Sequence, residues 1–103
     1  MSDYEEQMRE LRERFIERAR GDRTALRAAL AGGDHYAARF IAHKLAGAAG
    51  IFGLDQISVT ASALERALPA ADQLGEGPDP AVTGAPAVSA AADALLALLD
   101  QLD

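Results

Sequence analysis

Apolar residues recur at intervals of three and four along almost the whole chain, and no other feature constrains the fold as strongly. This spacing gathers apolar side chains on one face of an α-helix. Half of the 103 residues are hydrophobic, with alanine and leucine dominant, and the aromatic residues are only two tyrosines and three phenylalanines. That composition favours helices over sheets, in which aromatic and β-branched residues are enriched. The sequence therefore predicts an all-α protein with a single domain over residues 1–103.

Local signals divide the N-terminal third of the chain into two predicted helices. Ser2 and Glu5 have the form of a capping box that begins the first helix. Gly21 and Asp22 are expected to end that helix, and a second is expected over residues 23–31. The apolar residues predicted to face the core in these helices are Tyr4, Met8, Leu11, Phe15, Ala19, Leu26 and Leu30.

Two further helices follow in the middle of the chain. A glycine pair at 32–33 ends the second helix, and Asp34 is a suitable N-cap for the third. Gly53 is expected to end the third helix, Asp55 to cap the fourth, and Pro69 to mark its end. The predicted core residues are Ile41, Leu45, Ala48 and Phe52 in the third helix, and Ile57, Ala61, Leu64 and Leu68 in the fourth.

Residues 69–86 contain all four prolines of the chain and three glycines, so a long mobile loop without core residues is expected there. A last helix is predicted from Ala87 to Leu102. Five amphipathic helices with mostly short connections predict an antiparallel four-helix bundle, with the additional N-terminal helix packed across its end. The core residues predicted in the last helix are Val88, Ala92, Leu95, Leu99 and Leu102.

The charge and composition exclude several classes of function. The formal net charge is −6 and the sequence pI is about 4.8, a balance that gives no electrostatic attraction for nucleic acid or anionic lipid. The absence of cysteine excludes disulfides and thiol chemistry. No apolar stretch approaches the roughly 18 residues of a membrane span, and the acidic start MSDYEEQ is unlike a signal peptide. A cytoplasmic protein that binds neither nucleic acid nor membranes is expected.

The third helix presents a histidine opposite its predicted core face. On a helical wheel His43 lies away from the apolar stripe, and Gly47 lies one turn beyond it on the same side. Glycine in a helix costs about 1 kcal/mol relative to alanine, and here it clears side chains from the surface beside the imidazole. We therefore predict that a partner docks on this face. The predicted docking residues are Tyr36, Arg39, Phe40, Lys44, Ala46, Gly47 and Gly50.

The stretch AHKLAGAAGIFGL, residues 42–54, resembles the signature of histidine-containing phosphotransfer (HPt) domains. That signature places an apolar residue, a glycine and a small residue after the histidine, and a further glycine several positions on. One position departs from the pattern, because Ala46 stands where the family frequently has lysine. The matching residues are His43, Leu45, Gly47, Ala48 and Gly53.

This resemblance implies that His43 is the phosphorylated residue of a two-component phosphorelay. Its Nε2 would exchange a phosphoryl group with the aspartate of a response-regulator receiver domain, in a pathway fed by a hybrid or cognate histidine kinase. The receiver domain is expected to supply Mg²⁺, so no cofactor is expected in this chain. The protein would be a monomeric phosphoryl carrier without its own kinase or ATP-binding domain. No second catalytic residue is apparent near His43 in the sequence.

Other interpretations of the histidine remain open. The chain could be a non-catalytic adaptor bundle whose glycines accept another helix, or a histidine-kinase dimerisation domain. Kinase dimerisation domains typically have an acidic residue directly after the histidine, where this chain has Lys44. His35, beside the Asp34 cap, is expected to be an ordinary surface residue. The two histidines give no credible metal site, and no hydrolase triad is apparent.

Overall fold

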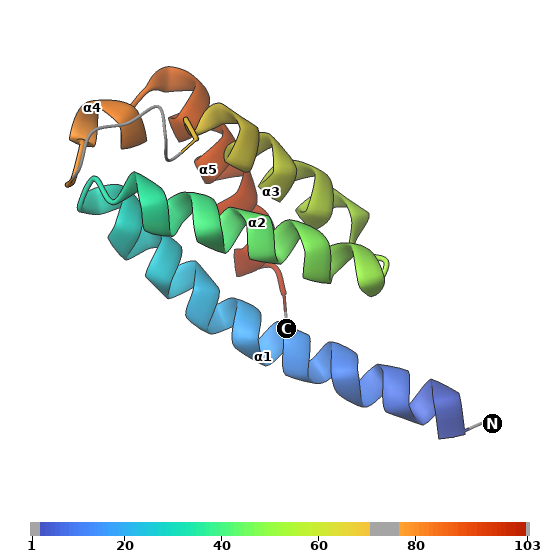
Figure 1. The fold of residues 1–103 in the computed structure, drawn as a ribbon. Helices are drawn as coiled ribbons and strands as arrows, with labels where there is room; N and C mark the ends of the chain where they lie inside the picture. The colour runs from blue at the N-terminus through green and yellow to red at the C-terminus, as the bar shows by residue number, and fades with distance from the viewer. Residues whose placement is uncertain (1–2, 71–76, 103) are drawn as a thin grey trace.

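The computed structural model describes residues 3–70 and 77–102, and all regular structure in these ranges is α-helical (Figure 1). The prediction of an all-α protein is therefore confirmed. Within the described residues, no helix is both long and apolar enough to cross a membrane. The helices are α1 (Asp3–Ala31), α2 (His35–Ile51), α3 (Asp55–Ala67), α4 (Pro80–Thr83) and α5 (Pro86–Asp100).

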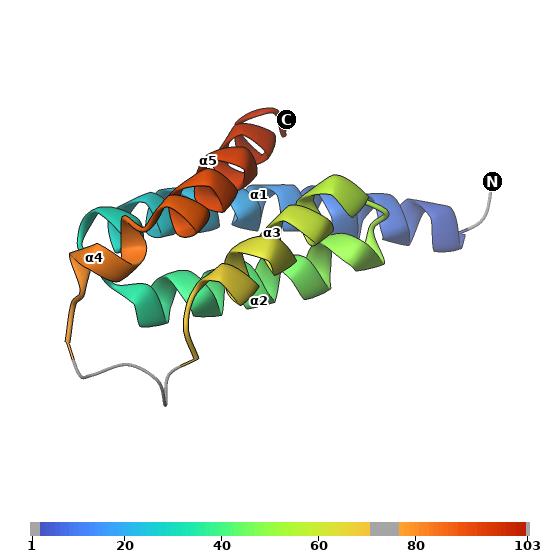
Figure 2. The same ribbon diagram turned by 90° about the horizontal axis from the view of Figure 1, so that it is seen from above.

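Four long helices surround one core. α1 contacts α2 and α5, and α3 contacts the same two helices, so the contacts form a closed ring. Successive long helices run in opposite directions, and α5 crosses the others at an angle (Figure 2). The apolar residues predicted to face inward in α3 and α5 are buried, except that Leu102 is partly exposed. The largest fully buried side chains are Leu26, Leu45, Leu64, Val88, Leu95 and Leu99.

The predicted break in the first helix is wrong. α1 runs without interruption through Gly21 and Asp22, and there is no separate N-terminal helix across the end of the bundle. The side chain of Asp22 does not turn back to end the helix, because it accepts a hydrogen bond from Lys44 of α2 at 3.2 Å. Ala19 and Leu26 are buried on either side of the glycine. Their packing outweighs the roughly 1 kcal/mol that one helical glycine costs.

The N-terminal end of α1 projects beyond the other helices (Figure 1). Tyr4 is 68% exposed and Leu11 is 45% exposed, so the prediction that these two residues face the core is wrong. Met8 is partly buried, and the fully buried residues of α1 begin at Phe15, whose ring lies 5.5 Å from that of Phe52 at the end of α2. Ser2, the predicted N-cap, lies outside the described residues.

In the turn between α1 and α2, Asp34 and Gly33 have the predicted capping and turn roles, and Gly33 also contacts the start of α4. Asp34 caps α2, and its carboxylate accepts a hydrogen bond from the Ala37 amide at 3.0 Å. Gly33 has φ of +71°, a conformation that favours glycine, and its carbonyl accepts from the Asp79 amide at 2.8 Å. A Cβ at position 33 would lie 2.9 Å from the nitrogen of Pro80. This turn therefore holds the start of α4.

The expectation of a long loop over residues 69–86 is wrong for its second half. Asp79 caps α4, which contacts both α1 and α5, and Thr83 within it is buried. α5 then begins at Pro86, where the fixed φ of proline suits the first turn of a helix. Residues 71–76 of the predicted loop lie outside the described residues. α3 begins at Asp55, but Leu54 occupies the N-cap position and makes no side-chain capping bond.

Substitution of two glycines tests the continuity of α1 and the turn that follows it. A Cβ at position 21 meets no described atom within 4 Å, so Gly21→Ala should raise the free energy of unfolding by up to about 1 kcal/mol. Gly33→Ala should lower the free energy of unfolding, because alanine disfavours the left-handed backbone at this position and its Cβ would displace Pro80. Urea unfolding of both variants checks these signs, and a destabilised Gly21→Ala protein would contradict the uninterrupted helix.

Candidate functional site

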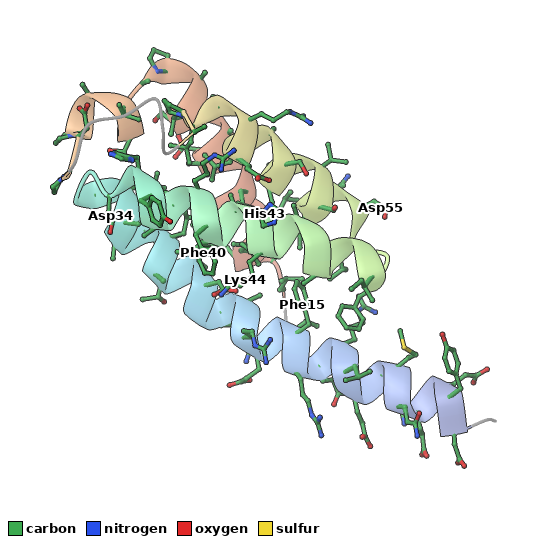
Figure 3. All side chains as sticks on the ribbon, viewed as in Figure 1. Phe15, Asp34, Phe40, His43, Lys44 and Asp55 are labelled. Carbon is green, nitrogen blue, oxygen red and sulfur yellow. The ribbon has the colours of Figure 1, made fainter. Side chains whose placement is uncertain are left out.

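His43 lies in the middle of α2 on the face away from the core, as the helical wheel predicts. Its side chain is 71% exposed, whereas Ile41 and Leu45, two residues to either side, are buried. In Figure 3 the imidazole stands on the side of α2 that borders α3. The reactive atoms of this ring are therefore open to a second molecule.

A carboxylate on the neighbouring helix orients this imidazole. Nδ1 of His43 lies 2.8 Å from Oε2 of Glu65, whose side chain is 22% exposed. A carboxylate only accepts hydrogen bonds, so Nδ1 carries a proton and donates a hydrogen bond to Glu65. In the neutral imidazole Nε2 then keeps its lone pair free. The contact gives the exposed histidine a defined tautomer with a nucleophilic nitrogen on the outer side.

Sequence reasoning missed Glu65. It lies 22 residues after His43 on a different helix, so no local spacing connects the two side chains. One signal was present: Glu65 directly follows Leu64, which belongs to the predicted core stripe, and this places it at the border of the buried face of α3. Pairing it with His43 also required the register between α2 and α3.

Small residues set that register by letting the two helices approach closely. Ser58 of α3 donates a hydrogen bond from its hydroxyl to the backbone carbonyl of Ala46 at 2.7 Å. A Cβ at Gly50 would lie 3.5 Å from the same hydroxyl oxygen. The alanines that are fully buried in α2 and α3 are Ala38, Ala42, Ala49 and Ala61.

A groove of about 250 Å³ runs from His43 toward the start of α2. Two exposed aromatic rings, those of Tyr36 and Phe40, border it. His35 also lines the groove but is only 8% exposed, and its Nε2 lies 3.2 Å from the carbonyl oxygen of Gly77. The prediction that His35 is a surface residue is therefore wrong, because its ring is buried and contacts the Gly77 carbonyl. The lining residues are His35, Tyr36, Arg39, Phe40, His43, Glu65 and Pro69.

The two cations near His43 have different surroundings. The ammonium of Lys44 lies 3.2 Å from the Asp22 carboxylate and 5.6 Å from the centre of the Phe40 ring, on the side of α2 that faces α1 (Figure 3). Arg39 lines the groove instead. Its Nε is buried and has no hydrogen-bond partner among residues 3–70 and 77–102. Lys44 is thus directed away from the groove, and Arg39 borders it.

The structure brings together only some of the predicted docking residues. Tyr36, Arg39 and Phe40 share the groove with His43, and Gly47 lies exposed one turn further along α2. A Cβ at Gly47 would meet no described atom within 4 Å, so this glycine makes no close helix contact that requires its lack of a side chain. Gly50 is exposed but borders Ser58. Ala46 is partly buried against the core, and Lys44 faces α1, so neither lines the groove.

The chain matches a known family of protein domains. The family model described as the Hpt domain matches residues 10–103, nearly the whole chain. The matched region includes both helices that carry the groove. No curated protein and no solved structure matches the chain. With its helical bundle and a match over almost its full length, the chain belongs to the Hpt domain family.

Proposed function

We propose that this protein carries a phosphoryl group on Nε2 of His43 in a two-component phosphorelay. The observation that carries the proposal is the hydrogen bond between Nδ1 of His43 and Glu65, which in the neutral imidazole of this exposed side chain leaves Nε2 without a proton. A four-helix bundle formed by α1, α2, α3 and α5 would be the rigid support for this side chain. Membership of the Hpt domain family supports the same role.

In the proposed reaction Nε2 attacks the phosphorus of an aspartyl phosphate on a receiver domain. The new N–P bond forms as the P–O bond to the aspartate breaks, and the aspartate leaves as a carboxylate. The imidazole becomes cationic because Nδ1 keeps its proton, and the Glu65 carboxylate at 2.8 Å stabilises that charge. The reverse sequence returns the phosphoryl group to a receiver.

The partner would complete the chemistry. The receiver domain is expected to supply Mg²⁺ and a lysine, which offset the charge of the transferring phosphoryl group. Among the residues described here, no group of three His, Cys, Asp or Glu side chains could hold a metal ion. Tyr36 and Phe40 offer exposed aromatic surface beside His43, a type of residue that often anchors protein interfaces. One copy of the chain contains the histidine, the carboxylate and the groove, so a monomer suffices.

Replacement of His43 tests the phosphorylation site. His43→Gln should abolish labelling by phosphorylated receiver domains, and the label on the wild-type protein should be acid-labile and base-stable, as a phosphoramidate is. His35→Gln is the control, since His35 is buried and should not compete for the phosphoryl group. Retention of the label in His43→Gln would contradict the assignment. Receiver binding by a wild-type protein that never takes up label would instead favour an adaptor.

A large side chain at Gly47 tests the docking face. Glutamine is the better helix former and the space at Gly47 is open, so Gly47→Gln should keep or raise the free energy of unfolding by up to about 1 kcal/mol. Phosphotransfer should nevertheless fall by up to about 100-fold, because a displacement of 1 Å between the reacting groups can cost that much.

Gly21→Gln is the matched control, because Gly21 is also a helical glycine in open space but lies on α1. It should gain similar stability and keep the wild-type transfer rate. Stability is measured by urea unfolding and transfer by single-turnover labelling from a phosphorylated receiver. Equal transfer rates in the two variants would mean that the partner does not approach α2 at Gly47.

A further inference from the structure

Arg39 has an unusual environment for an arginine. It precedes His43 by four residues on α2, so the two side chains are neighbours on the helix surface, and both line the groove. Its Nε is buried, and among the described residues Arg39 has neither a hydrogen-bond partner for this Nε nor an ion pair. Buried N–H groups are nearly always paired. The arrangement points to an acceptor from outside the described residues.

The acidic groups nearby already have partners. Glu65 lines the same groove but accepts from Nδ1 of His43, and Asp22 accepts from Lys44 on the other side of α2. Lys44, engaged by Asp22 and the Phe40 ring, is not directed into the groove. Arg39 is therefore the cation that the described groove offers to a new anion.

We propose that the Arg39 guanidinium binds the oxygens of the phosphoryl group once His43 is phosphorylated. This inference rests on the proposed function. A guanidinium presents its N–H donors in a planar fork that matches two oxygens of a phosphoryl group. Phosphorylation places a dianion on an imidazole that already touches the Glu65 carboxylate, so the groove gains negative charge on both sides of the ring. Arg39 offsets this charge and gains the acceptor that its buried N–H lacks.

The test measures the charge of the phosphoryl group directly. Potassium phosphoramidate, a small phosphoryl donor, is used to phosphorylate His43 without a partner protein, and the ³¹P resonance of the product is followed against pH. The titratable side chains around the groove are His35, Tyr36, Arg39, His43 and Glu65. A nearby cation favours the dianion, so the ³¹P midpoint should lie about one pH unit lower in the wild type than in Arg39→Gln.

Two further variants separate a phosphoryl contact from a structural effect. Arg66→Gln removes the same charge from an exposed arginine on α3 that does not line the groove, and it should shift the midpoint by less than about a third of a pH unit. Arg39→Lys keeps the charge without the planar fork, so its midpoint should stay near that of the wild type. Arg39→Met, which also removes the charge, carries the test if Arg39→Gln fails to fold.

The possible results distinguish this inference from the proposed function. Equal midpoints in the wild type, Arg39→Gln and Arg39→Lys would overturn the role of Arg39 and leave the phosphorelay role intact. A His43 that accepts phosphoryl from phosphoramidate but exchanges it with no receiver domain would overturn the phosphorelay role. The titration would still decide whether Arg39 binds the phosphoryl oxygens.

Discussion

The close contact between α2 and α3 is the interaction on which the site depends. Two hydrogen bonds cross it, one from Ser58 to the Ala46 carbonyl and one from His43 to Glu65. Buried alanines along both helices allow this approach, and alanine loses no side-chain rotamer freedom when it packs. A larger residue in this contact would separate the helices and lengthen both bonds. The reactive imidazole is therefore oriented by the backbone packing of two helices as well as by its own neighbours.

Helical periodicity predicted much of this arrangement, because each helix buries one stripe of apolar side chains. It identified the buried faces of α3 and α5 and the exposure of His43. The break predicted at Gly21 rested instead on a local signal of about 1 kcal/mol, and tertiary packing on both sides of the glycine outweighs it. It also missed Glu65, since this contact joins residues 22 positions apart and depends on the register between α2 and α3.

The two histidines show how neighbours decide the chemistry of one residue type. Both line the groove, but His43 donates from Nδ1 to a carboxylate, whereas Nε2 of His35 lies beside the Gly77 carbonyl. A carbonyl oxygen accepts only, so Nε2 of His35 carries a proton in this contact. In the neutral imidazole the nitrogen with the lone pair is then Nδ1, in a ring that is almost entirely buried. Sequence position at a helix start could not reveal this, because the covering segment lies more than forty residues away.

The long first helix divides the molecule into parts that unfold differently. Residues from Phe15 onward contribute to the core, whereas the preceding turns of α1 have no fully buried side chain within the described residues. These turns extend a helix that is already nucleated, so they can unwind without disturbing the core. Their amide protons should exchange by local opening, while those near Leu26 exchange only when the whole bundle opens. The helical content of this protein can consequently fall without a loss of its cooperative stability.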